Sequence, residues 1–119
     1  MRIGEAAAAA GTTTRALRYY EQQGLLAARR TGKGYRDYDE RAVRRVRNIR
    51  ELLAIGFTVE DVRAFADLLD QDLPDRFAVR GDGVCAEAMR VARDRLRLLN
   101  ERIDRITDLR DQLTARLVP

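Results

Sequence analysis

The sequence predicts a fold dominated by α-helices, in which short helices and a small β-hairpin precede one long coiled-coil helix. Three observations support this prediction. Glycines separate short helical segments in residues 1–69, and residues 25–38 change to a glycine- and tyrosine-containing stretch. From residue 85 onward, apolar side chains recur at alternating steps of four and three. We therefore divide the chain into residues 1–69, a linker over 70–84, and a dimerisation helix over 85–119.

The first two predicted helices lie on either side of a tight turn. An alanine-rich stretch from Ile3 to Ala10 ends at Gly11, where a left-handed backbone is easily formed. The threonines at 12–14 offer N-cap hydroxyls to a second helix, which continues through Glu21 and stops at Gly24. Two short helices in this order predict a helix-turn-helix.

Residues 25–38 predict a hairpin, or wing, because Gly32 and Gly34 flank Lys33 between an apolar run and two tyrosines. A third helix should follow, capped near Asp39 and ended by Gly56. Its predicted inward stripe holds Val43, Val46, Ile49 and Leu53, with Arg41, Arg44, Arg45, Arg47 and Arg50 largely outside it.

A fourth helix should begin at the capping-box sequence Thr58-Val59-Glu60-Asp61 and fade near Leu69. Phe57 and Val62 occupy the two positions of a hydrophobic staple around this box. The segment from Asp70 to Val84, which contains one proline, two glycines and four aspartates, is typical of an irregular linker.

The long C-terminal helix carries a heptad seam with one charged interruption, at Arg110. The seam begins at Cys85 and continues through Met89, Ala92, Leu96, Leu99, Ile103, Ile106, Leu113 and Leu117. A helix over residues 86–117 spans about 48 Å, which exceeds what a domain of this size covers with its own helices. We expect a second copy of the chain to cover the seam, although a helix folded back on its own domain is the alternative.

Composition limits the function classes. Residues 1–50 carry 12 basic and 5 acidic side chains, and residues 51–119 carry 11 and 14. A basic front half favours contact with a polyanion such as nucleic acid, although a solvated arginine-rich surface gives the same count. With no histidine and one cysteine, the chain offers no catalytic constellation, so we expect no enzyme. No signal peptide or 18-residue apolar run is present, so we expect a cytoplasmic protein with no membrane partner.

The chain resembles the mercury-resistance regulator (MerR) family of bacterial transcription factors. The resemblance rests on G-T-T-T-R-A-L-R-Y-Y-E-Q-Q-G-L-L at 11–26, R-R-T-G-K-G-Y-R-D-Y at 29–38 and L-L-A-I-G-F-T-V-E-D-V at 52–62, before a terminal coiled coil. It implies a winged helix-turn-helix DNA-binding domain followed by an antiparallel coiled coil.

The predicted DNA-binding residues lie on the second helix and the wing. Helix residues at the N-terminus reach base edges in the major groove, and wing cations reach phosphates or the minor groove. For Tyr20 a core position is the alternative to DNA contact, and for the wing a solvated basic loop. The full predicted set is Thr12, Thr13, Thr14, Arg15, Arg18, Tyr19, Tyr20, Arg30, Lys33, Gly34, Tyr35, Arg36 and Tyr38.

The resemblance also implies a homodimer bound to double-stranded promoter DNA, which acts on RNA polymerase indirectly by distorting the DNA when an effector binds. The effector is unknown. The fourth helix and the linker would form the bistable joint that such a mechanism needs. A constitutive or architectural DNA-binding dimer without an effector, and a coiled-coil adaptor that binds an acidic protein, are the alternatives.

Cys85 has three interpretations: a small apolar seam residue, a lone sensor thiol near a helix N-terminus, or part of a metal site. In metal-responding members of the family, the first residue of the dimerisation helix faces a metal loop beyond the partner's helix. This chain ends at Pro119, before such a loop, and one thiol without histidine makes an incomplete site for a soft metal. We therefore expect no bound cofactor.

Overall fold

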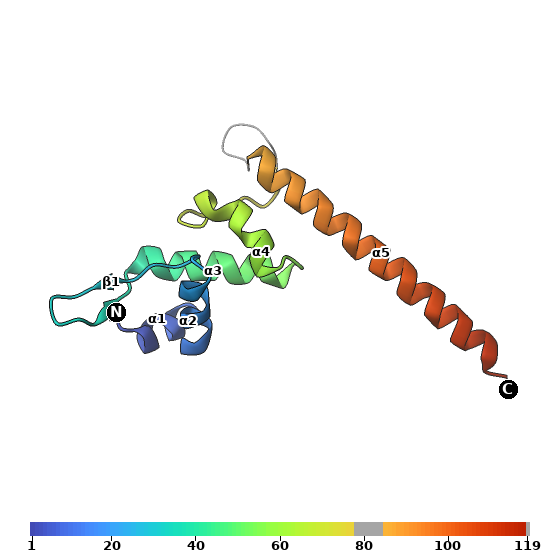
Figure 1. Ribbon diagram of the computed structural model, residues 1–119, viewed down its shortest axis with the longest axis horizontal. Helices are drawn as coiled ribbons and strands as arrows, with labels where there is room; N and C mark the ends of the chain where they lie inside the picture. Colours follow the sequence, from blue (N-terminus) through green and yellow to red (C-terminus); the bar gives the residue numbers. More distant parts are fainter. Residues whose placement is uncertain (78–84, 119) are drawn as a thin grey trace.

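The computed structural model describes residues 1–77 and 85–118 and shows a mainly helical protein with a small hairpin and one long C-terminal helix (Figure 1). The predicted fold class is confirmed. The elements are α1 (Ile3–Ala9), α2 (Thr14–Gln22), β1 (Arg29–Arg30), β2 (Arg36–Asp37), α3 (Glu40–Ala54), α4 (Val59–Val62), the 3-10 helix η1 (Arg63–Leu68) and α5 (Ala86–Arg116).

The turn between α1 and α2 depends on a glycine and a threonine. Gly11 has a φ of 70°, in the left-handed region that favours glycine. Thr13 is the N-cap of α2, because its hydroxyl accepts the backbone N–H of Ala16 at 3.1 Å. The predicted N-cap therefore falls on the middle one of the three threonines.

The core lies around α3, which contacts α1 and α4, while α1 in turn packs on α2. Val43, Val46 and Ile49 are buried as predicted, whereas the next buried position is Leu52 and Leu53 is only half-buried. A 3.6-residue repeat tolerates this shift of one position, because both leucines lie beside the same stripe.

The fourth predicted helix begins as expected but changes its geometry. Thr58 and Asp61 form the complete capping box, and the staple residues Phe57 and Val62 are both buried. However, α4 ends at Val62, and the chain continues as η1 to Leu68. The segment remains helical, but its second half has tighter 3-10 turns than the predicted α-helix.

The first part of the predicted linker, residues 70–77, packs on this core. The ring of Phe77 lies 5.3 Å from that of Phe65 and 6.4 Å from that of Phe57, measured between centroids. The buried side chain of Asn48 donates to the carbonyl oxygens of Leu69 and Gln71, at 2.9 and 2.6 Å. Residues 78–84, the rest of the predicted linker, lie outside the described residues.

Helix α5 begins against η1 and then extends away from the rest of the chain (Figure 1). Its 31 residues span about 46 Å at the helical rise. Ala88 is fully buried in the core, and Asp61 of α4 accepts the Nε–H of Arg95 at 2.8 Å. None of the helices in the described ranges combines the length and apolar character needed to span a bilayer.

Candidate nucleic-acid interface

Helix α2 and its N-cap residue expose four of the residues that we predicted to meet DNA. Thr13, Arg15, Arg18 and Tyr19 are exposed, and Tyr19 retains 45% of its surface. Thr12 and Thr14 are half-buried at the turn. The exposed set combines one threonine hydroxyl, two guanidinium groups and a phenol, which suit base edges and phosphates.

The wing is a two-stranded antiparallel hairpin, in which Arg30 pairs with Arg36. Thr31 organises its tip: its carbonyl accepts the N–H of Gly34 at 2.9 Å, and its hydroxyl accepts the N–H groups of Lys33 and Tyr35. Gly34 has a φ of 84°, which a side chain would strain. All residues from Arg29 to Arg36 are exposed, so the hairpin is available to a partner.

Glu21 of α2 joins the recognition helix to the wing. Its carboxylate accepts the Tyr38 hydroxyl and lies 3.0 Å from Nε of Arg36. Burial, followed by the bond to Glu21, raises the pKa of Tyr38 to about 12. The hydroxyl is therefore a permanent donor at neutral pH, which fixes the base of the wing against α2.

The structure contradicts the predicted DNA contact of Tyr38. Only 1% of this residue is exposed, and its hydroxyl is committed to Glu21. Tyr20 is also a core residue, with 6% exposed, so the structure supports the alternative given for it. By contrast, Tyr19 and Tyr35 are exposed, with 45% and 47% of their surfaces accessible to solvent. Each of the two tyrosine pairs of this chain therefore has one buried and one exposed ring, and the sequence alone does not distinguish them.

Several arginines of α3 have internal partners rather than a free surface role. Arg47 donates to the carbonyl of Ala9 at 2.7 Å, and Arg50 donates to that of Ala10 at 3.0 Å. Both bonds satisfy carbonyl groups at the C-terminal end of α1, which its helix leaves unpaired. Both arginines keep their charge and are exposed, but part of their hydrogen-bonding capacity holds α3 to α1.

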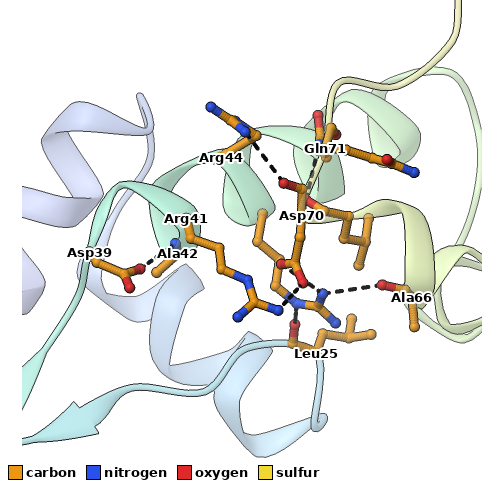
Figure 2. Close-up of polar contacts among 11 residues, drawn as sticks. Leu25, Asp39, Arg41, Ala42, Arg44, Ala66, Asp70 and Gln71 are labelled. Carbon is orange, nitrogen blue, oxygen red and sulfur yellow. Dashed lines mark hydrogen bonds and ion pairs between the residues drawn. The ribbon is translucent and has the colours of Figure 1, made fainter.

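Arg45 is the centre of an internal hydrogen-bond network that the sequence did not predict. It donates to the carbonyls of Leu25 and Ala66 and pairs with Asp70 at 3.2 Å. Asp70 also pairs with Arg41, whose Nη2 lies 2.5 Å from Asp70 Oδ2 (Figure 2). The hydrogen bond from Arg41 lowers the pKa of Asp70, against a smaller opposing effect of burial. The network ties the chain before the wing to α3, η1 and the start of residues 70–77.

The predicted seam of α5 divides into two parts. Met89 and Ala92 pack against the chain's own core, and Leu99 approaches Gly56, where an added Cβ would lie 3.3 Å from Leu99 Cδ1. The later seam residues extend into solvent together with further apolar side chains that the heptad pattern did not include. The exposed apolar set is Leu96, Leu98, Ile103, Ile106, Leu109, Leu113, Leu117 and Val118.

Cys85 is the N-cap of α5 and is exposed. Its sulfur accepts the N–H of Ala88 at 3.4 Å and lies 4.0 Å from the carbonyl oxygen of Ala64. Within residues 1–77 and 85–118, no three His, Cys, Asp or Glu side chains gather closely enough to hold a metal ion. One thiol with these backbone neighbours does not fit a soft-metal site.

An exposed helix N-terminus beside a basic hairpin, both held by one buried core, defines a winged helix-turn-helix DNA-binding domain. Family comparison gives the same class: residues 1–69 match the MerR HTH family regulatory protein, and residues 43–116 match the family described as MerR, DNA binding. The chain belongs to the MerR family of helix-turn-helix transcriptional regulators, and it is not expected to be an enzyme.

Curated relatives agree with this assignment. The HTH-type transcriptional regulator HmrR of Rhizobium leguminosarum bv. viciae is 32% identical over 95% of this chain and 81% of its own length. The nodulation protein NolA of Bradyrhizobium sp. (strain NC92) is 48% identical over 56% of this chain, but that match spans only 28% of NolA. The mercuric resistance operon regulatory protein of Bacillus cereus is 38% identical over 60% of this chain and 54% of that protein.

Solved structures reproduce the whole arrangement. The transcription regulator PbrR691 from Ralstonia metallidurans CH34, crystallised in complex with lead(II), superposes with a TM-score of 0.76 at 26% identity, covering 97% of this chain and 83% of that one. A MerR family regulator from Listeria monocytogenes shares the fold at a TM-score of 0.59 and 21% identity, over 98% of this chain and 82% of that one.

Proposed function

We propose that this protein is a homodimeric, sequence-specific regulator that binds promoter DNA through α2 and the wing and alters transcription by distorting that DNA. The observation that carries the proposal is the Glu21 junction, where one carboxylate holds Tyr38 and Arg36 and so fixes the wing beside the exposed face of α2. A fixed spacing between two DNA-contacting elements is what a duplex with its own fixed groove spacing requires. Such a regulator works beside the chromosome, in the bacterial cytoplasm.

Dimerisation is supported by the exposed apolar side chains of α5. Isolated apolar residues are normal on a surface, but a continuous set along one helix favours a protein partner. A second copy is the simplest occupant, because a closed two-fold dimer pairs identical surfaces and the seam repeats along the helix.

The predicted dimer can be tested at Ile106, which is 65% exposed. Ile106→Asp should give a monomer in sedimentation while leaving the thermal unfolding of the DNA-binding domain intact. Gln112→Asp, an equally charged change at an exposed site outside the seam, is the matched control and should remain dimeric. Leu99→Asp is a poorer test, because Leu99 packs near Gly56 of its own chain. A wild-type monomer would refute the dimer.

DNA recognition can be tested by selecting a duplex from a randomised pool with the wild-type chain. Arg15→Ala should change the preferred sequence, because this exposed guanidinium lies at the N-terminal end of α2, whereas the Thr13 hydroxyl is needed to cap the helix. Arg18→Ala should weaken binding to all duplexes by similar factors, as expected for the loss of a phosphate contact. A wild-type chain that selects no duplex would refute the proposed function and favour the adaptor alternative.

The response to an effector is tested at Cys85, because the potential metal ligands in the described residues do not gather into a metal site. Transcription from a promoter with an over-long spacer, with and without thiol-reactive agents, separates two cases. A response that Cys85→Ser abolishes supports a sensor thiol. An identical output under all conditions supports the constitutive DNA-binding dimer.

A further inference from the structure

A hollow of about 250 Å³ opens where the start of α1, helix α2 and the wing meet. Four arginines line it: Arg2, Arg18, Arg30 and Arg36. Arg18 comes from α2, Arg30 and Arg36 come from the two strands of the wing, and Arg2 is the N-cap residue of α1. Since one water occupies about 30 Å³ of liquid, the hollow has room for a tetrahedral anion and its hydration.

The positive charge in this hollow is only partly neutralised by the protein. Arg36 is paired with Glu21 at 3.0 Å. Among the described residues, no carboxylate pairs with Arg2, Arg18 or Arg30, and Arg30 donates only to the neutral carbonyl of Gly34 at 3.4 Å. Like charges that converge without a counter-charge favour an anionic ligand.

Arg2 is held in place by an aromatic ring rather than by an acid. Its Cζ atom lies 3.9 Å from the centroid of the Tyr35 ring, within the range of a cation–π contact. Its main chain is also fixed, because its carbonyl accepts the N–H of Ala6 at 3.0 Å. Stacking uses the face of the guanidinium and leaves its N–H donors free in the plane.

We propose that this hollow seats a backbone phosphate of the bound DNA, and that Arg2, stacked on Tyr35, donates to that phosphate together with Arg18. The inference rests on the proposed DNA-binding function and adds a residue from outside both the recognition helix and the wing. Arginine is suited to this role, because its planar fork matches two phosphate oxygens. Tyr35 acts as a positioning residue, whose ring orients the guanidinium.

The salt dependence of DNA binding tests the contact. Each phosphate contact contributes roughly 0.9 to the slope of log affinity against log salt, which is roughly a 3- to 4-fold weakening between 50 and 200 mM salt. Arg2→Gln should lower the slope by roughly 0.9 per protomer on the duplex selected by the wild type and on a mixed-sequence duplex alike. Arg93→Gln, on the exposed surface of α5, removes the same charge and should leave the slope unchanged.

Neutral methylphosphonate linkages, introduced one at a time into the selected duplex, identify the phosphate. One linkage per half-site should weaken DNA binding by the wild type and should weaken binding by Arg2→Gln by a smaller factor, because only the Arg18 contact is left to lose. Tyr35→Leu should weaken DNA binding when Arg2 is present but should not weaken it further in Arg2→Gln. Tyr35→Phe keeps the ring, so Arg2→Gln should weaken binding by the same factor in Tyr35→Phe as in the wild type.

Three outcomes are decisive. If the wild type binds the duplex and Arg2→Gln keeps the full salt slope with an unchanged thermal melt, the phosphate seat is wrong while the proposed function stands. If the wild type binds no duplex, the proposed function and this inference both fail. If inorganic phosphate binds the free protein in an Arg2-dependent manner and every methylphosphonate weakens both proteins equally, the hollow takes free phosphate and the DNA contact is refuted.

Discussion

The ion pair between Asp61 and Arg95 should be a major stabilising contact between α4 and α5. Both side chains are largely shielded, with 17% and 15% of their surfaces exposed. Asp61 Oδ2 accepts two hydrogen bonds, one from the backbone N–H of Thr58 at 3.0 Å and one from Arg95 Nε at 2.8 Å. One carboxylate therefore completes the capping box of α4 and binds the long helix.

The expected cost of Asp61→Ala follows from these two bonds. Loss of the capping bond costs about 1 kcal/mol, and loss of a hydrogen bond between charged groups costs about 2 kcal/mol. The sum of about 3 kcal/mol should lower the melting temperature of a chain of this size by roughly 10 °C. Arg95→Ala should cost about 2 kcal/mol, because the capping bond survives.

A double-mutant cycle, measured by urea unfolding at one fixed protein concentration, isolates the pair. The coupling between Asp61→Ala and Arg95→Ala should be about 1.5–2 kcal/mol and should persist in high salt. The control pair, Arg97 and Glu101 on the same helix, is 61% and 59% exposed and should couple by only about 0.3–0.5 kcal/mol. A coupling for Asp61 and Arg95 as small as that of the control pair would refute the reasoning.

Three further changes test other parts of the structure. Tyr38→Phe should cost about 1 kcal/mol in urea unfolding, because the buried hydroxyl no longer donates to Glu21. Asn48→Leu should cost about 2–3 kcal/mol, because the carbonyls that the amide serves lose their donor, and amide hydrogen exchange should quicken in residues 69–71. Stability should fall on acidification below about pH 4, because Asp61 and Asp70 have lowered pKa values in the folded state and the unfolded chain takes up protons first. The free energy of unfolding, compared between pH 3 and pH 7, measures this fall. A double variant with Asp61→Ala and Asp70→Ala should show a smaller fall.

Local sequence signals predicted most of the elements, because their causes lie within a few residues. The Thr58 capping box, the Asp39 cap and the glycine after α1 each act over a single turn. The stripe of α3 was correct to within one position for the same reason.

The missed features depend on contacts between distant segments. Arg47 and Arg50 resemble any solvated arginines, and only the crossing of α3 with α1 brings carbonyls 38 and 40 residues away into reach. Tyr38 was assigned to DNA because it is a tyrosine in a basic wing, yet its ring closes the core over Glu21. In the sequence, Arg2 is only a basic residue next to the first helix. Its proposed phosphate contact depends on the Tyr35 ring of the wing, which lies far away in the sequence.

The contacts at the start of α5 bear on how a signal would travel between the long helix and the DNA-binding domain. Three of them fix α5 to the preceding helices: Ala88 in the core, Arg95 on Asp61, and Leu99 beside Gly56. Gly56 has a φ of 111°, which strains any other residue, and a Cβ added there would lie 3.3 Å from Leu99 Cδ1, so Leu99 packs beside the backbone turn that leads into α4. Because Asp61 lies in the first turn of α4, a displacement of α5 must carry α4 with it or break the bond between Arg95 and Asp61, whereas the bond from Thr58 lies within α4 and survives. The joint that a distorting regulator requires is therefore better sought in the ends of α4 and η1 than at Arg95 itself.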